Sequence, residues 1–389
     1  MIPVAALANS GTPWLTVAGG IPLLGAIVVA LLPVRFAKVT TLLFALVDLV
    51  WVIVMATQFN TSGPTFQFTE EYSWIPQFGV HYALGVDGIA LVLIGMTAVL
   101  MPVVILASWH DADGAVDSGG ATPRTPRDVK RSPKMYFALM LVLDTMMIGT
   151  FAATDVFLFY VFFEAMLVPM YFMIGSFGVG PRQYAAVKFL LYSLLGGLLM
   201  LVAVIALYVY SGESALTGHH GTFIFYTLTH IALSSTVQKW LFLGFFIAFA
   251  IKAPLWPFHT WLPDAASSAQ PGAAVLMLGV MDKVGTFGMI RYCLELFPAG
   301  FHYFTPLILV LAVISIIYGA IVAIGQTSMK RLIGYTSISH FGFIVLGIFA
   351  LTSQGQSGAT LYMVNHGFAT GALFLLAGFL IVRWYIHRM

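Results

Sequence analysis

Six ionisable side chains suited to proton transfer lie inside long apolar stretches of this sequence. They are Glu164, Lys188, Lys252, Lys283, His340 and His366. A charged side chain at the centre of a bilayer costs about 2.5 kcal/mol or more, so each is a functional candidate by default. Histidine suits intermediate proton steps because its unperturbed pKa lies near working pH. The six residues, called here the predicted row, therefore indicate proton-transfer chemistry.

The predicted row has one member in each of several successive apolar segments. If those segments are helices packed side by side, the groups lie in the membrane plane. A buried lysine beside a carboxylate stays charged, whereas an unpaired one releases its proton easily. A structural role for Glu164 would need a cation from another helix, and Lys252 is the best candidate. The row could thus load, pass and release a proton without a cofactor.

Several of the ionisable side chains in the apolar segments also have a purely structural interpretation. Lys188 lies near a segment end, where its side chain could reach the interface. His340 and His366 could be satisfied core histidines. Asp48 and Asp144 could serve function or be satisfied by hydrogen bonds between helices. Three further aspartates are expected to fix loops or helix ends: Asp87, Asp264 and Asp282.

The composition requires a membrane protein. Of 389 residues, 60% are hydrophobic and 8% charged, whereas a soluble domain has roughly 25% charged residues. The net charge of +2 forms no basic patch, so nucleic acid is excluded as a partner. The single cysteine, Cys293, cannot hold an iron–sulfur cluster, which needs about four thiolates. The apolar runs are continuous, which favours helices over a barrel.

The apolar segments predict an all-α polytopic protein with about eleven transmembrane helices. The predicted spans are 15–34, 39–58, 82–108, 135–153, 155–177, 184–210, 240–268, 271–297, 303–325, 332–351 and 357–382. The seventh span carries Pro254, Pro257 and Pro263, which predicts a broken helix. Broken helices in transporters mark the transport site.

The basic residues predict an orientation. Twelve Lys and Arg residues fall on one face and two, Lys239 and Arg291, on the other. The positive-inside rule therefore places the N-terminus outside and the loop 109–134 inside. The outer loop 211–237 contains His219, His220 and His230, for which a solvated loop is a better interpretation than a metal site.

Six motifs then follow one another along the chain. They are DVFLFYVFFEAMLVPMYFMIGSFG (155–178), YAAVKFLLYSLLGG (184–197), IKAPLWPFHTWLPDA (251–265), VLMLGVMDKVGTFGMIRY (275–292), KRLIGYTSISHFGFIVLG (330–347) and NHGFATGALFLLAG (365–378). Together they resemble the antiporter-like membrane subunits of proton-pumping NADH:quinone oxidoreductase, respiratory complex I. LGVDGIALVLI (84–94) and FEAMLVPMYF are most similar to the chain-4 type, subunit M.

The resemblance implies inverted five-helix repeats, each with a broken helix, plus flanking helices. Three regions are expected: 1–134 with three helices and the basic inner loop, 135–297 as the first repeat, and 298–389 as an incomplete second repeat. The family's second repeat continues with another broken helix that carries an ionisable group. We therefore expect a truncated chain that lacks this part.

The resemblance also implies roles for residues. The family's fifth-helix carboxylate falls on Glu164 and its partner lysine on Lys252, with Lys283 as the connecting lysine. His340 and His366 match the histidines of the family's central hydrophilic axis, and Lys188 matches its sixth-helix lysine. One departure is Ala266, which replaces a second histidine after the break, so that His259 stands alone there.

The implied function is a non-redox, proton-translocating subunit of this enzyme. FMN, iron–sulfur clusters, NADH and quinone would be held by partner subunits, with no cofactor or metal in this chain. Expected partners are the adjacent antiporter-like subunits, the other membrane-arm subunits, lipid and, indirectly, the hydrophilic redox subunits. The expected location is the bacterial inner membrane.

Three alternatives remain open. Mrp-type Na⁺/H⁺ antiporter subunits share the same motifs and charged residues. A cytochrome b-like subunit could use His340 and His366 as axial haem ligands. A structural spacer would tolerate replacement of the intramembrane lysines.

Overall fold

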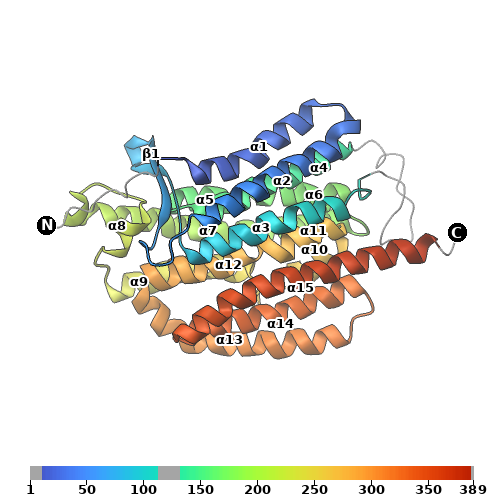
Figure 1. Ribbon diagram of the computed structural model, residues 1–389. Coiled ribbons are helices and arrows are strands. Elements are labelled where there is room, and N and C mark those ends of the chain that lie inside the picture. The colour runs from blue at the N-terminus through green and yellow to red at the C-terminus, as the bar shows by residue number, and fades with distance from the viewer. Residues whose placement is uncertain (1–10, 113–131, 387–389) are drawn as a thin grey trace.

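The protein is a bundle of long helices that run roughly along one axis (Figure 1). The computed structural model describes residues 11–112 and 132–386. In these ranges, ten helical segments are long and apolar enough to cross a membrane. The predicted polytopic helical fold is confirmed. Most of the basic loop predicted at 109–134, and its orientation, lie outside the described residues.

The N-terminal region adds a hairpin that the sequence did not indicate. Its elements are α1 (Trp14–Leu31), α2 (Val34–Thr57), β1 (Gln67–Ile75), η1 (Pro76–Phe78), β2 (Val80–Val86) and α3 (Gly88–Ala107). The two strands pair antiparallel, with Tyr72 opposite Tyr82. The predicted span began at residue 82 because strand β2 and helix α3 form one apolar run. Asp87 separates them, since its Oδ1 accepts a hydrogen bond from the Ala90 backbone N–H at 2.8 Å and so caps α3.

The middle of the chain contains an interruption that the apolar pattern did not reveal. The elements are α4 (Pro133–Ala152), α5 (Val156–Ala165), α6 (Leu167–Phe177), α7 (Arg182–Gly212), η3 (Ala215–Thr217) and α8 (Phe225–Thr229). Helices α5 and α6 divide at Met166, within the predicted span 155–177. Glu164 therefore lies in the last turn of α5, just before the division.

The predicted break in the seventh span is confirmed. Helix α9 (Ser235–Lys252) ends at Lys252, and eight residues separate it from α10 (Trp261–Ser268). Ending a helix leaves carbonyl groups without intrahelical partners. The indole N–H of Trp261 donates to the carbonyl oxygen of Ile251 at 2.9 Å and satisfies one of them. This hydrogen bond from α10 therefore stabilises the end of α9 at the break.

A fully buried helical segment follows the break and occupies the centre of the bundle. It consists of α11 (Pro271–Val275), the π-helical turn η4 (Leu276–Met281), α12 (Lys283–Gly288) and the π-helical turn η5 (Met289–Leu294). π-Helical turns inside helices are often found at functional sites. Three long helices complete the described chain: α13 (Pro298–Ile324), α14 (Met329–Phe349) and α15 (Ser353–Ile386). They lie together on the side of the bundle opposite α1 (Figure 1). The inverted repeats and the three-region division stay predictions.

Candidate functional site

Glu164 is held against a glycine of the neighbouring helix α7. A Cβ atom added at Gly197 would lie only 1.8 Å from Glu164 Oε1. No larger residue fits there unless the carboxyl group moves. Among the described residues, the buried Oε1 atom has no hydrogen-bond partner. The carboxyl group is therefore positioned by close packing and not by hydrogen bonds.

Lys252 ends helix α9 directly at the break and is buried. Its Nζ lies 4.9 Å from the centre of the Phe163 ring and makes no hydrogen bond within the described chain. Its electrostatic neighbours are Glu164 and Asp282. Sequence analysis named Lys252 as the partner of Glu164. In the structure the two side chains interact electrostatically, and no hydrogen bond joins them.

Asp282 lies between the two central lysines, which corrects the expectation that it fixes a loop or helix end. It is fully buried inside a continuous helical segment and caps nothing. Both carboxyl oxygens lack hydrogen-bond partners in the described structure, and the group interacts electrostatically with Lys283 and Lys252. Helices α12 and α9 approach so closely that a Cβ added at Gly285 would lie 2.6 Å from the Phe249 carbonyl oxygen. This close approach brings Asp282 and Lys252 together.

Lys283 is joined directly to the histidines. Its Nζ lies 2.7 Å from His366 Nδ1 and also donates to the Leu278 carbonyl. The rings of His366 and His340 are 5.3 Å apart between centres, and His340 Nδ1 lies 2.6 Å from the Tyr362 hydroxyl. Sequence analysis missed Tyr362, although it lies one helical turn before His366 on α15.

These contacts define one continuous arrangement, which we call the central row. Its members are Glu164, Lys252, Asp282, Lys283, His366 and His340. They come from α5, α9, the junction of η4 and α12, α15 and α14. Five of the six sequence-predicted residues belong to it. Side chains from distant parts of the chain thus form a file of ionisable groups across the interior of the bundle.

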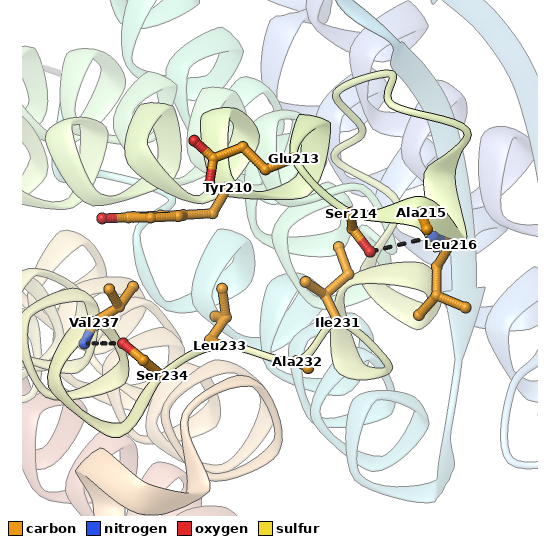
Figure 2. Close-up of a pocket in the computed structure, with 10 residues that line it drawn as sticks. All are labelled: Tyr210, Glu213, Ser214, Ala215, Leu216, Ile231, Ala232, Leu233, Ser234 and Val237. Carbon is orange, nitrogen blue, oxygen red and sulfur yellow. Dashed lines mark hydrogen bonds between the residues drawn. The ribbon is translucent and has the colours of Figure 1, made fainter.

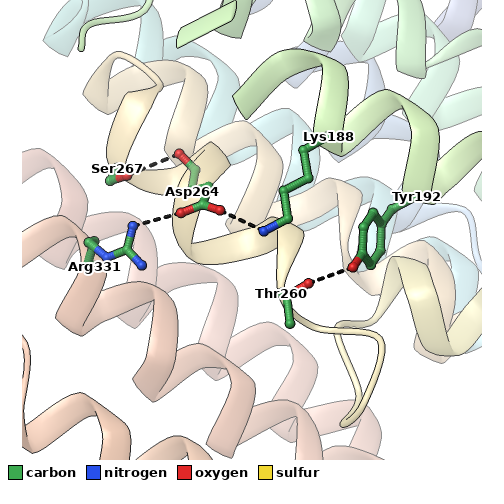
Figure 3. Close-up of polar contacts among 6 residues, drawn as sticks. All are labelled: Lys188, Tyr192, Thr260, Asp264, Ser267 and Arg331. Atoms are coloured by element: carbon green, nitrogen blue, oxygen red, sulfur yellow. Dashed lines mark hydrogen bonds and ion pairs between the residues drawn. The ribbon is translucent and has the colours of Figure 1, made fainter. Parts of the chain in front are cut away.

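Lys188 is the predicted residue that stands apart (Figure 3). Its Nζ forms an ion pair of 2.8 Å with Asp264 Oδ2, and Arg331 binds the other oxygen, Oδ1, at 2.7 Å. We call these three residues the Asp264 triad. The triad ties α10 to α7 and α14, which agrees with the structural role expected for Asp264. Lys188 is thus held in a fixed ion pair outside the central row.

Two other expectations concern paired and unpaired aspartates. Asp87 forms a 2.8 Å ion pair with Arg291 besides capping α3, which confirms its expected role. Arg291, which the sequence placed on the outer membrane face, is buried. Of the two readings left open for Asp48 and Asp144, hydrogen bonding to donor groups of neighbouring helices is not observed. Both are fully buried, and their oxygens have no hydrogen-bond partner among the described residues.

The bundle also has a pocket away from the central row. It has a volume of about 480 Å³ and lies between the end of α7 and the start of α9 (Figure 2). Glu213 is its one acidic lining residue. In the part of the chain that the structure describes, no group of three or more His, Cys, Asp or Glu residues could hold a metal ion. The loop histidines gain no support as a metal site.

A helical membrane bundle with a broken helix and an internal file of Glu, Lys and His defines an antiporter-like membrane subunit. The family model for the membrane part of NADH:quinone oxidoreductase and Mrp antiporters matches residues 153–387, which is more than half of the chain. The chain belongs to this family.

Individual relatives agree with that assignment. The NADH-quinone oxidoreductase subunit M of Mycobacterium tuberculosis is 53% identical over 96% of this chain and 71% of its own length. The subunit of the same name from Rhodobacter capsulatus is 38% identical over 91% of this chain and 66% of its own length.

Solved structures show the same fold. A chain of respiratory complex I from Thermus thermophilus matches with a TM-score of 0.81 and 31% identity, over 94% of this chain and 71% of the other. A chain of the Mrp complex from a Dietzia species matches with a TM-score of 0.74 and 23% identity, over 92% of this chain and 37% of the other. At that identity the second match speaks for the fold alone.

Proposed function

We propose that this chain is a proton-translocating membrane subunit of NADH:quinone oxidoreductase. The observation that carries the proposal is the central row, in which buried and half-buried ionisable groups follow one another without ion-pair contacts between them. Lys252 lies near two carboxyl groups yet makes no hydrogen bond within the described chain. Such a lysine can exchange its proton when a neighbouring charge moves. The names of the M. tuberculosis and R. capsulatus relatives support the assignment to this enzyme.

The proposed mechanism begins with an electrostatic change that arrives from a neighbouring subunit and alters the interaction between Glu164 and Lys252. Lys252 then takes or gives a proton. The proton passes by Asp282 to Lys283 and on to His366 and His340. The 2.7 Å contact between Lys283 and His366 supports the direct transfer between these two groups. Bound water would bridge the longer gaps.

The chemistry of electron transfer belongs to partner subunits in this proposal. The one cysteine, Cys293, is buried and cannot hold a cluster alone. FMN, iron–sulfur clusters, NADH and quinone would be bound by those partners. Exposed apolar side chains along α2, α7 and α13 suit contact with lipid or with adjacent antiporter-like subunits. The proposed location is the bacterial inner membrane, with the N-terminus outside and the loop 109–134 in the cytoplasm.

The variant Glu164→Gln tests the proposal because it removes the charge and keeps the shape. We expect the number of protons pumped per electron to fall sharply in membrane vesicles that oxidise NADH. The matched control is Glu213→Gln in the pocket at the end of α7, which should leave the ratio unchanged. A near-normal ratio in Glu164→Gln would overturn the role given to Glu164.

A second candidate is an Mrp-type cation/proton antiporter subunit, favoured by the shared family model. Isolation from native membranes in mild detergent separates the two candidates. Partners that carry flavin and clusters, together with NADH:quinone activity, would support the respiratory enzyme. Small membrane partners without NADH oxidation, and a sodium-dependent collapse of a pH gradient, would support the antiporter.

The haem alternative fits the geometry poorly. His340 and His366 have ring centres only 5.3 Å apart. Rings in such close contact leave no room for a porphyrin between them. A purified protein without a Soret absorption band would exclude haem.

A further inference from the structure

Asp48 and Asp144 lie at the same level of two neighbouring helices, α2 and α4. A Cβ added at Gly25 of α1 would lie 2.6 Å from Phe44 of α2 and 3.0 Å from Leu141 of α4, so the three helices meet there. Asp48 follows Phe44, and Asp144 follows Leu141, by about one helical turn. Helices α2 and α4 lie side by side with α1 (Figure 1). The two aspartates therefore face one small region.

Both carboxyl groups are sealed inside the protein. Each side chain has 0% of its surface exposed. All four oxygens lack hydrogen-bond partners among the residues described. The neighbouring Thr145 hydroxyl is engaged elsewhere, since it lies 2.9 Å from the Gly19 carbonyl oxygen and donates to it. The two carboxyl groups do interact electrostatically with each other.

Within residues 11–112 and 132–386, no cation is paired with either carboxyl group. Helices α1 and α3, which pack against both α2 and α4, carry no titratable side chain. The titratable groups on α2 and α4 and on the other described elements packed against α4 (α5, α6, α12 and β2) are Arg35, Lys38, Lys134, Tyr136, Tyr160, Glu164, Tyr171, Lys283, His81 and Tyr82. Asp144 interacts electrostatically with Asp48.

We propose that Asp48 and Asp144 form a proton-binding site inside the membrane, separate from the central row. One carboxyl group carries the proton and donates an O–H···O hydrogen bond to the other. An isolated ionised carboxylate is very costly in an apolar interior, and two adjacent like charges cannot both persist there. A shared proton removes one charge and gives both groups a partner. In this proposal, helices α2 and α4 hold a proton that takes no part in proton transfer along the central row.

A proton fits this site better than a metal ion. Hard cations take about six or more oxygen ligands, and the pair belongs to no cluster of three or more metal-binding side chains in the described structure. The proposal does not depend on the proposed pumping function, because it concerns the protonation state of two residues outside the central row.

Infrared difference spectroscopy of the complex isolated from native membranes tests the site. We expect the wild type minus Asp144→Asn, and the wild type minus Asp48→Asn, each to show the carbonyl stretch of a protonated carboxylic acid at neutral pH. The band should shift in deuterium oxide. Asp264→Asn is the matched control, because its carboxylate is paired with Lys188 and Arg331. That variant should remove a carboxylate band alone.

Two results would overturn the proposal. One is that Asp48→Asn and Asp144→Asn remove carboxylate bands alone, as the control does. The other is that replacing potassium chloride with sodium chloride shifts the bands of the pair, which would indicate a metal ion. If the asparagine variants do not assemble, Asp48→Glu and Asp144→Glu keep both carboxyl groups but change their positions. Each should shift the protonated carboxyl band, and a band that neither variant shifts overturns the site.

Discussion

Two lysines of this bundle show how the same side chain acquires opposite roles. Lys188 makes a 2.8 Å ion pair with Asp264, and its side chain is 19% exposed. Lys283 is fully buried and contacts a histidine ring nitrogen and a backbone carbonyl, not a carboxylate oxygen. An ion pair holds the proton on a lysine, whereas a neutral partner in a desolvated site lets it go. The Asp264 triad is therefore a fixed structural clamp, and the central row is the region free to exchange protons.

The largest expected effect is that of Lys283→Met in the central row. Loss of a positioned proton-transfer group typically lowers a rate by about 100-fold or more. We expect a loss of proton pumping of this order, measured as acidification of inverted vesicles that oxidise NADH.

Lys188→Met is the matched comparison for Lys283→Met. A partly exposed ion pair is typically worth about 0–1 kcal/mol, so pumping should change by less than about fivefold. Equal losses in the two variants would remove the distinction between clamp and row. Normal pumping in both would support the structural-spacer interpretation.

The second prediction concerns Gly197→Ala on α7. The new methyl group would occupy the space of Glu164 Oε1 and push the carboxyl group aside. A displacement of about 1 Å at a reacting group can lower a rate by as much as about 100-fold, so pumping should fall between about 10- and 100-fold. The control is Gly95→Ala on α3, where an added Cβ meets nothing within 4 Å. Unchanged pumping in Gly197→Ala would show that the exact placement of Glu164 is not required.

The third prediction moves to the clamp. Asp264→Asn leaves Lys188 and Arg331 side by side without their shared carboxylate. Each partly exposed ion pair is worth about 0–1 kcal/mol, and the two cations repel each other once the carboxylate is gone, so we expect a loss of stability of about 1–2 kcal/mol. Thermal unfolding of the detergent-solubilised complex measures it, with Arg331→Met expected to cost less. A loss of pumping at unchanged thermal stability would place Asp264 in the proton path instead.

Within the central row, the smallest effect is expected for Tyr362→Phe. This variant removes the hydroxyl that lies 2.6 Å from His340 Nδ1 and leaves the ring. One such hydrogen bond contributes about 0.5–1.5 kcal/mol, which corresponds to a change of about 2- to 10-fold in pumping. The dependence of pumping on pH should also shift, because the proton affinity of His340 depends on this contact. An unchanged pH profile would place His340 outside the path.

The sequence alone determined the features that depend on local chemistry. Long apolar runs fix which segments cross a membrane, because each helix must satisfy its own backbone in lipid. Three prolines within ten residues fix the break after Lys252, because proline cannot continue the hydrogen-bond ladder. The rare ionisable residues in those runs identified five members of the central row. None of these features depends on which helix packs against which.

The tertiary structure decided the contacts between distant residues. Lys283 meets His366 across 83 positions of sequence, and Asp264 meets Lys188 across 76 and Arg331 across 67. No local pattern encodes these separations, because helix packing selects which faces meet. Packing likewise placed Asp282 between two lysines and left Asp48 and Asp144 together without a counter-ion among the described residues. A charge in this bundle takes its role from its neighbours, because in a desolvated interior the nearest partner decides whether a proton stays or leaves.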